Sequence, residues 1–185
     1  MARIACLGWG SLIWEPKDLP VQGKWFNEGP LISVEFARQS NNGRITLVLV
    51  ETECLLHSLW ALMKTQDLPS AIEALVVREE IPPKNADKHI GRWSTGQPSP
   101  KLIPTLSEWA QANNLDHVIW TSLPPKFNKM DIIPTAEQVV EYLKKLSGES
   151  RKVAEQYIRF APQQIATRYR HCIESSLHWY PMDVD

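Results

Sequence analysis

Short apolar runs separated by turn residues fill the first third of the chain and predict strands. Residues Arg3–Leu7 form an apolar run that ends at a glycine, which is typical of a buried strand. Two runs rich in β-branched residues, Leu31–Ala37 and Arg44–Val50, flank Ser40–Gly43, whose composition favours a hairpin turn. Residues Leu55–Met63 predict a third strand of the same antiparallel meander.

The pattern changes to a helical period after residue 66. Asp67 can serve as an N-cap, and apolar residues then recur at helical spacing over 68–81, until two prolines stop the helix. Capping-box patterns at Thr105 and Thr135 predict two further helices, the second of them ended by Gly148. We further expect a strand at His117–Ser122, a helix from Ser150 to Phe160 and an amphipathic segment from Pro162 to Ile173. Residues 14–30 and 83–104 should be irregular, apart from extended structure at Ile90–Trp93.

Strands first and helices mainly later form an α+β pattern. The 43% hydrophobic and 22% charged residues are a usual globular mix, and 185 residues can bury a core without disulfides or metals. No repeat, low-complexity tract or linker divides the chain. We therefore expect one domain over residues 1–185.

Charge and cysteine usage exclude several classes of partner. The chain has 20 Lys plus Arg against 21 Asp plus Glu, so it lacks the basic excess that nucleic-acid binding requires. Cys6, Cys54 and Cys172 are scattered singly, which predicts free buried thiols in a reducing cytoplasm, and the histidines show no metal-ligand spacing. The N-terminal apolar stretch is too short and too glycine-rich for a signal segment or a membrane span, so no membrane partner is expected.

A loop and a helix carry the candidate chemistry. The loop Gly8–Leu12 follows the first predicted strand, and its two glycines let backbone amides approach a ligand closely. On the helix over 68–81, an advance of about 100° per residue puts Glu79 on the apolar stripe with Leu75, whereas Glu80 should face solvent. Because burial raises the pKa of a carboxyl group, Glu79 is the candidate group for proton transfer.

Other roles for these residues remain open at this point. Glu79 can instead pair with Arg78 or Arg38 and only support packing. Nucleophilic chemistry is less favoured, because Ser11 has no GxSxG frame and Cys6 lies within a predicted strand. The loop also lacks the third glycine and the following helix of a dinucleotide site.

Two segments together resemble the γ-glutamylcyclotransferase-like superfamily, and most of all its ChaC branch. They are Gly-Trp-Gly-Ser-Leu-Ile-Trp-Glu-Pro at 8–16 and Val-Arg-Glu at 77–79. That branch has a GYGSLIWNP-like loop after its first strand and a catalytic glutamate in a VRE-like sequence at the end of a helix. The chain also keeps the branch's order of Phe36-Ala37-Arg38, Gly43-Arg44 and an apolar strand near Trp60.

The resemblance implies a fold and a reaction. The fold would be a small closed or nearly closed mixed β-barrel flanked by helices. The enzyme would need no cofactor, and Glu79 would take a proton from the α-ammonium of a small γ-glutamyl compound, whose amine then attacks the γ-carbonyl and releases 5-oxoproline. The residues implied to hold the carboxylate end of the substrate are Gly8, Trp9, Gly10, Ser11 and Leu12, with Arg38 as a further candidate.

The sequence departs from the branch at two places. Trp9 stands where the branch has a tyrosine, so an indole donor replaces a hydroxyl. After Glu79 the chain continues with prolines instead of a tyrosine-bearing strand, so no preference for a leaving group, glutathione included, carries over. The oligomeric state is not indicated by the sequence.

Two other functions stay open beside the enzyme. The first is a non-catalytic module that binds a small molecule or a carboxylate in the same loop. The second is a partner surface marked by exposed tryptophans, which requires Trp25 and Trp93 to face solvent together.

Overall fold

The computed structural model describes residues 1–183, which form two compact units. Unit 1 consists of Met1–Gly8, Glu15–Ile32 and His57–Leu123, and unit 2 of Trp9–Trp14, Ser33–Leu56 and the described residues from Pro124 onward. Each unit is therefore assembled from separate segments of the chain. The single domain over 1–185 stays a prediction, and its last two residues lie outside the described part.

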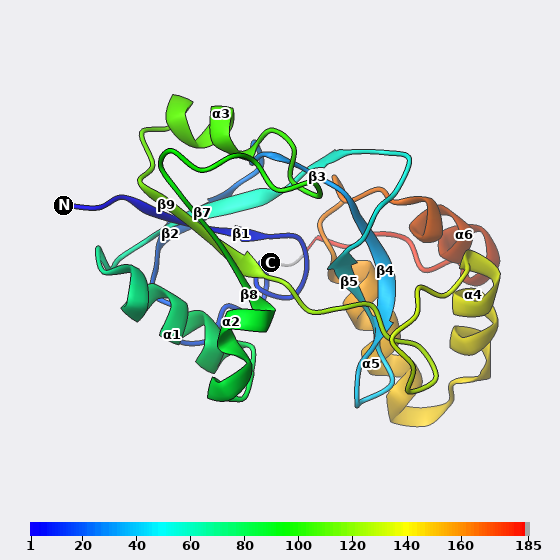
Figure 1. The fold of residues 1–185 in the computed structure, drawn as a ribbon. Coiled ribbons are helices and arrows are strands. Elements are labelled where there is room, and N and C mark those ends of the chain that lie inside the picture. The colour runs from blue at the N-terminus through cyan, green and yellow to red at the C-terminus, as the bar shows by residue number, and fades with distance from the viewer. Residues whose placement is uncertain (184–185) are drawn as a thin grey trace. The chain divides into compact units, whose positions relative to one another are not determined.

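Unit 1 is built on a mixed five-stranded sheet of order β2-β7-β1-β9-β8 (Figure 1). The central strand β1 runs antiparallel to β7 and parallel to β9. Its residues are apolar or small and all are buried, which is typical of a strand covered on both faces. The strands of the sheet are β1 (Ile4–Gly8), β2 (Val21–Phe26), β7 (Leu59–Met63), β8 (Ile90–Ser94) and β9 (His117–Thr121).

Helices cover both faces of this sheet (Figure 1). On one face lies α1 (Leu68–Arg78), which begins where the side chain of Asp67 accepts a hydrogen bond from the Ser70 amide at 3.0 Å. On the other face lies α3 (Leu106–Ala112), whose Trp109 ring packs edge-on against Trp60 of β7 at 5.2 Å. The short helices η1 (Pro83–Asn85) and α2 (Ala86–His89) lead into β8.

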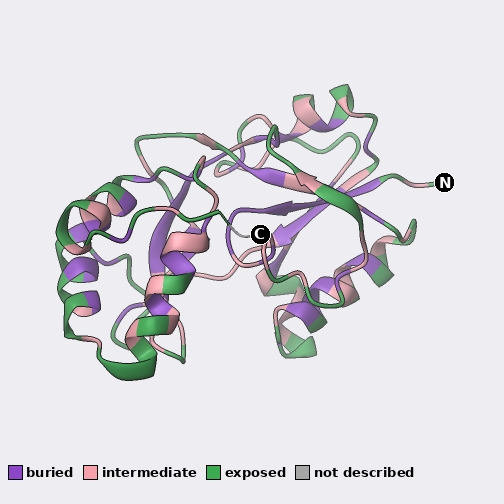
Figure 2. Ribbon diagram, turned by 180° about the vertical axis from the view of Figure 1, so that it is seen from behind, coloured by how far each residue is buried: buried purple, intermediate pink, exposed green. Residues whose placement is uncertain are grey.

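Unit 2 combines a β-hairpin with three helices. The hairpin strands β4 (Val34–Gln39) and β5 (Ile45–Leu49) pair antiparallel across the predicted turn. The helices are α4 (Ala136–Lys145), α5 (Gly148–Phe160) and α6 (Arg168–Leu177), and Figure 2 shows them with buried inner and exposed outer faces. The guanidinium of Arg170, 1% exposed, donates to carbonyls at the end of α5 and so ties α5 to α6.

The predicted α+β class is confirmed, but the prediction of a closed or nearly closed barrel is wrong, because the sheet does not close. The five-stranded sheet stays open, with β2 and β8 as its two edges. The hairpin of β4 and β5 pairs within itself and adds no strand to that sheet. Likewise β7 pairs with β1 and not with β5, so it is not the third strand of a meander. The short strands β3 (Leu31–Ile32) and β6 (Leu56–His57) form a ladder of their own.

Several local predictions differ from the structure for identifiable reasons. The stretch 14–30 contains β2, which was missed because its residues are mostly exposed and show no apolar alternation. Thr105 precedes α3, but its hydroxyl accepts a hydrogen bond from the Leu31 amide and forms no capping box. Thr135 does form its capping box with Gln138. Gly148 starts α5 and does not end α4, which stops at Lys145.

The side-chain burial settles two further expectations. Trp93 is 1% exposed and its indole donates to the Gln97 carbonyl, so no solvent-facing patch joins it to Trp25. Cys6 is a buried free thiol as predicted, whereas Cys54 is exposed and Cys172 lies between these extremes. Within residues 1–183, none of the helices has the length and apolar character needed to cross a bilayer.

Candidate active site

Glu79 lies at the end of α1, and its surroundings differ sharply from those of Glu80. The Glu79 amide donates to the Leu75 carbonyl at 3.0 Å and closes the last helical turn. Its side chain is 15% exposed. The Glu80 side chain is 78% exposed and pairs with Lys17 at 2.9 Å. The two adjacent carboxylates therefore face different environments, as the helical spacing predicts.

Arg78 holds Glu79 in place. One guanidinium nitrogen of Arg78 lies 3.1 Å from Oε1 of Glu79. The other two nitrogens donate to the Glu15 carbonyl at 3.1 and 2.6 Å. The Arg78 side chain is only 7% exposed. Its guanidinium connects the end of α1 to Glu15, the residue at which the chain returns from the loop.

The Glu79 carboxylate also lies close to β1. Burial raises the pKa of the Cys6 thiol far above its usual value, and the negative charge of Glu79 raises this pKa further. Cys6 precedes Gly8, the last residue of β1, by two positions. Within unit 1, Glu79 therefore stands beside the strand that leads into the candidate loop.

The residues that α1 buries differ in part from those that the helical spacing predicts. The structure buries Ala71, Leu75, Val76 and Arg78, whereas Ile72 is only partly buried. A buried arginine in this stripe was not expected, although the sequence offered Glu79 as a partner for its charge. The Glu15 carbonyl and Glu79 are its partners in the structure.

The candidate loop is well packed in unit 2. Trp9 and Leu12 are 5% and 6% exposed, and the Ile13 amide donates to the Gly10 carbonyl at 3.0 Å to close a turn. A Cβ at position 10 would lie 2.5 Å from the hydroxyl oxygen of Tyr157. Gly10 is therefore needed for the close approach of Tyr157, more than for freedom of the backbone.

Tyr157 of α5 is the residue around which this loop packs. Its ring makes edge contacts with Trp14 at 5.4 Å and with Phe36 at 6.5 Å. Its hydroxyl accepts a hydrogen bond from the Leu47 amide at 3.2 Å, and the Arg44 guanidinium lies 5.4 Å from the ring centre. Tyr157 thus connects the loop to the hairpin and to α5.

Arg38 lies on β4 and has a partner within unit 2. Its guanidinium donates to the Pro124 carbonyl at 2.7 Å. Burial lowers the pKa of Arg38, although the carboxylate of Asp131 opposes that shift. This contact matches the ordinary structural role of a strand arginine, and a contact of Arg38 with substrate stays a prediction.

The predicted site residues thus divide between the two units. Unit 1 holds Gly8 and Glu79, and unit 2 holds Trp9, Gly10, Ser11, Leu12 and Arg38. The structure brings Glu79 together with Arg78, and Gly10 together with Tyr157, and the charge of Glu79 acts on Cys6. The joint action of Glu79 and the loop stays a prediction.

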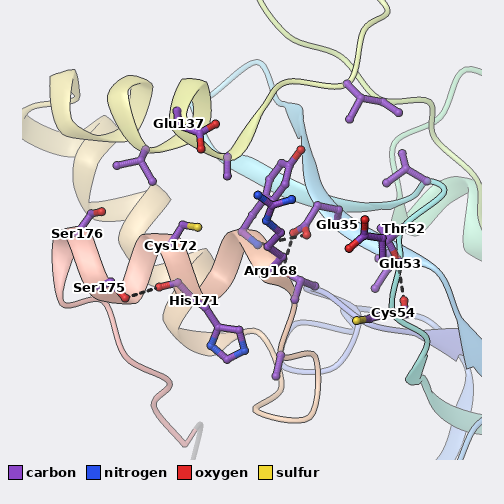
Figure 3. Close-up of a pocket in the computed structure, with 18 of the residues that line it drawn as sticks. Glu35, Thr52, Glu53, Cys54, Glu137, Arg168, His171, Cys172, Ser175 and Ser176 are labelled. Atoms are coloured by element: carbon purple, nitrogen blue, oxygen red, sulfur yellow. Dashed lines mark hydrogen bonds between the residues drawn. The ribbon is translucent and has the colours of Figure 1, made fainter.

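A groove of about 950 Å³ in unit 2 was not predicted (Figure 3). It lies between α4, α6 and the chain that follows β5, and Glu35 of β4 is at its base. The Glu35 carboxylate is 4% exposed and accepts hydrogen bonds from the Thr167 hydroxyl at 2.5 Å and from the Phe36 and Tyr169 amides at 2.8 and 3.2 Å. Burial is the main cause that raises the pKa of Glu35.

Glu35, Arg78 and Tyr157 are the polar residues that sequence reasoning missed or undervalued. Glu35 lies in a strand whose alternation suggests an outward position, and two of its partners, Thr167 and Tyr169, are more than 130 residues away in sequence. Arg78 was considered only as a partner for Glu79. No local signal reveals such contacts, because they depend on how distant segments meet.

Comparison with solved structures reveals a shared fold. The chain is similar to a γ-glutamylcyclotransferase specific to glutathione from yeast, with a TM-score of 0.50 and 12% identity, over 96% of this chain and 98% of the yeast chain. The selenomethionine-labelled form of that yeast enzyme gives a TM-score of 0.51 and 13% identity, over 97% and 98% of the two chains. No family model matches this chain. No curated protein sequence matches it.

Proposed function

We propose that this protein releases 5-oxoproline from a small γ-glutamyl compound and that Glu79 moves the proton. The observation that carries the proposal is the position of the Glu79 carboxylate, which is 15% exposed, held by Arg78 and close to Cys6 on β1. The fold shared with a glutathione-specific γ-glutamylcyclotransferase supports it, as does the resemblance of the loop and of the Val-Arg-Glu triplet.

The proposed reaction needs one carboxylate and no co-reactant. Glu79 takes a proton from the α-ammonium of the substrate, and the freed nitrogen forms a bond to the γ-carbonyl carbon. The bond from that carbon to the leaving amine then breaks as Glu79 returns its proton to the leaving nitrogen, and the ring nitrogen gives up its second proton to the released amine, which leaves as an ammonium. Since ring closure is intramolecular, the main task of the protein is to fold the substrate and to place the carboxylate.

In this proposal the other site residues bind and position. Gly8, Trp9, Gly10, Ser11 and Leu12 hold the α-carboxylate of the substrate through the loop backbone and the serine hydroxyl. Arg78 positions Glu79 and the Glu15 carbonyl together, since its guanidinium contacts both. Tyr157 supports the loop at Gly10. Arg38 is a weaker candidate for binding substrate, because its guanidinium already donates to the Pro124 carbonyl.

A second candidate function is a module that binds a small carboxylate without turnover. The ion pair between Glu79 and Arg78 favours it, because a glutamate that only supports packing would make that contact. Under this alternative the loop binds its ligand equally well when Glu79 is replaced by glutamine. Under the enzyme proposal binding also survives, but turnover does not.

The experiment is a 5-oxoproline release assay over a panel of γ-glutamyl dipeptides, glutathione and γ-glutamylamines. Glu79→Gln should reduce release by about 100- to 10,000-fold, the usual contribution of a positioned acid–base group. The matched control is Glu80→Gln, since that neighbouring carboxylate is 78% exposed and should not affect release. Absence of release by the wild-type protein, with binding of a panel member still detectable, would favour the binding module.

A further inference from the structure

The groove of unit 2 has an apolar floor, to which β4, α4 and the chain after β5 contribute. Its buried apolar residues are Val34, Val50, Ala136 and Val140. The groove volume of about 950 Å³ is that of a small-molecule site, and such sites are mostly apolar with a few placed polar groups. Alkyl groups that cover this floor leave water, which is favourable. The floor therefore suits a hydrocarbon chain.

The rim of the same groove is mainly acidic. Glu51 and Glu53 stand on the wall formed by the chain after β5, and Glu137 and Glu141 stand on the wall formed by α4. All four residues are exposed. Figure 3 shows Glu53 and Glu137 on these two different walls of the groove. Carboxylates thus lie on both sides of an apolar floor.

Two cations also line the groove, but they do not neutralise it. The ammonium of Lys144 lies 3.1 Å from Oε1 of Glu141 on the same helix. Arg168 is exposed at the start of α6. A hydrogen bond from its own backbone amide is the main cause that lowers the pKa of Glu137, and the charge of Arg168 lowers it further, so this carboxylate stays ionised. The four carboxylates of the rim therefore exceed its two cations.

The two helix N-termini at this groove do not make it an anion site. A helix N-terminus attracts anions, and both α4 and α6 begin here. At α6 the Glu35 carboxylate already accepts from the Tyr169 amide at 3.2 Å. At α4 the Thr135 hydroxyl accepts from the Gln138 amide at 3.2 Å, and Glu137 lies in the first turn. An anion would meet carboxylates here, whereas a cation would find them as partners.

We propose that this groove binds a linear polyamine, whose alkyl segments cover the apolar floor while its ammonium groups pair with carboxylates on both walls. Charge complementarity carries this choice, together with the apolar floor between the charged walls. A metal ion would need its ligands clustered, and within residues 1–183 no group of three or more His, Cys, Asp or Glu could hold one. The inference does not rest on the proposed function, because the groove lies in unit 2 and Glu79 in unit 1.

The test is calorimetric titration of spermine into the whole protein at low ionic strength. Glu53→Gln and Glu137→Gln should each raise Kd by about three- to five-fold, the effect of one exposed ion pair, and the double variant by about ten-fold. The matched control is Glu149→Gln, an exposed carboxylate of α5 that pairs with Lys152 and does not line the groove. It should keep Kd within about two-fold of wild type.

A second variant reverses the sign of the effect. Arg168→Gln removes a cation that competes with the ligand, so we expect Kd for spermine to fall by about three-fold. Butylamine, with a single ammonium group, should bind at least about ten-fold more weakly than spermine to wild type. Because Glu53, Glu137 and Arg168 are all exposed, the variants should keep the far-UV spectrum of wild type.

Four results would overturn the inference. Wild type might bind no spermine. Equal Kd values for Glu53→Gln, Glu137→Gln and Glu149→Gln would show adventitious surface binding only. Weaker binding of spermine by Arg168→Gln would contradict the competition between Arg168 and the ligand. Tighter binding of tetralysine than of spermine would assign the groove to a basic protein partner. None of these results bears on 5-oxoproline release.

Discussion

Glu79 of unit 1 and Glu35 of unit 2 are both largely withdrawn from water, yet their partners differ in kind. Glu79 faces the guanidinium of Arg78 and keeps 15% of its side chain exposed. Glu35 is 4% exposed and accepts hydrogen bonds from neutral donors, the Thr167 hydroxyl and two backbone amides. Burial alone therefore does not mark a catalytic carboxylate.

The difference shows what each carboxylate can do. The donors of Glu35 include the Tyr169 amide in the first turn of α6, so Glu35 joins β4 to the start of that helix. Glu79 is at the C-terminal end of its helix, and its charge acts on Cys6 of β1. A carboxylate fully engaged in joining two elements is a structural group, whereas the partly exposed Glu79 keeps part of its side chain open to solvent.

The largest expected effect on stability is at Arg78. Arg78→Met leaves the partly buried Glu79 carboxylate and the Glu15 carbonyl without the guanidinium, so we expect a loss of about 3 kcal/mol in the free energy of unfolding. Urea unfolding measures it. The control is Lys17→Met, which breaks the exposed pair with Glu80 and should lower stability by less than about 1 kcal/mol. Equal losses of unfolding free energy in Arg78→Met and Lys17→Met would show that the guanidinium of Arg78 is not needed to stabilise the Glu79 carboxylate.

Glu35→Gln should destabilise unit 2 by about 2 kcal/mol without a change in turnover per folded molecule. One side-chain oxygen becomes an NH₂ group, which cannot accept from the Thr167 hydroxyl or from the Phe36 and Tyr169 amides. Urea unfolding and 5-oxoproline release measure the two effects. Glu53→Gln, an exposed residue of the same groove, is the control and should leave the midpoint unchanged. A fall in turnover of folded Glu35→Gln would show that Glu35 takes part in the reaction, which would contradict the different roles given to Glu35 and Glu79.

Gly10→Ala should destabilise the loop by about 1 kcal/mol, because its methyl group would meet the Tyr157 hydroxyl at 2.5 Å. Tyr157→Phe removes that oxygen and leaves the ring carbon at an ordinary 3.5 Å. We therefore expect the double variant to be more stable than the sum of the single changes predicts. Purely additive free energies of unfolding would show that Tyr157 does not support the loop at Gly10.

The smallest expected effect is a pH dependence at Glu35. Burial raises the pKa of this carboxyl group above its usual value, and the hydrogen bond from Thr167 only partly opposes the shift. The folded protein thus holds the proton more tightly than the unfolded chain, so the stability this group contributes is complete at low pH and is lost as pH rises through the raised pKa. The stability advantage of wild type over Glu35→Gln should therefore shrink as pH rises above the ordinary titration range of a glutamate. An advantage that grows with pH would contradict this account.

Patterns of local residues predicted much of the secondary structure. The buried strand β1, the hairpin of β4 and β5, and the helix capped by Asp67 follow from apolar period and turn chemistry. Strand β2 could not be found in this way, because an exposed edge strand lacks the alternation that reports burial. The pairing of β7 with β1 and the open sheet were also out of reach, since pairing between distant strands leaves no local signature.

The candidate site was predictable only in part. Helical spacing distinguished Glu79 from Glu80, because the turn of a helix is fixed by geometry. The same spacing did not reveal that Arg78 is buried, because that burial depends on the Glu15 carbonyl, 63 residues earlier. Tyr157 had no signal at all, since the packing of α5 defines its neighbours.

The most direct test of the account is kcat for 5-oxoproline release by wild type, Glu79→Gln and Glu35→Gln, measured where all three are folded. We expect Glu79→Gln to lose at least about 100-fold and Glu35→Gln to stay within about two-fold of wild type. If Glu79→Gln turns over as fast as wild type, or if both variants lose activity equally, Glu79 is not the group that moves the proton.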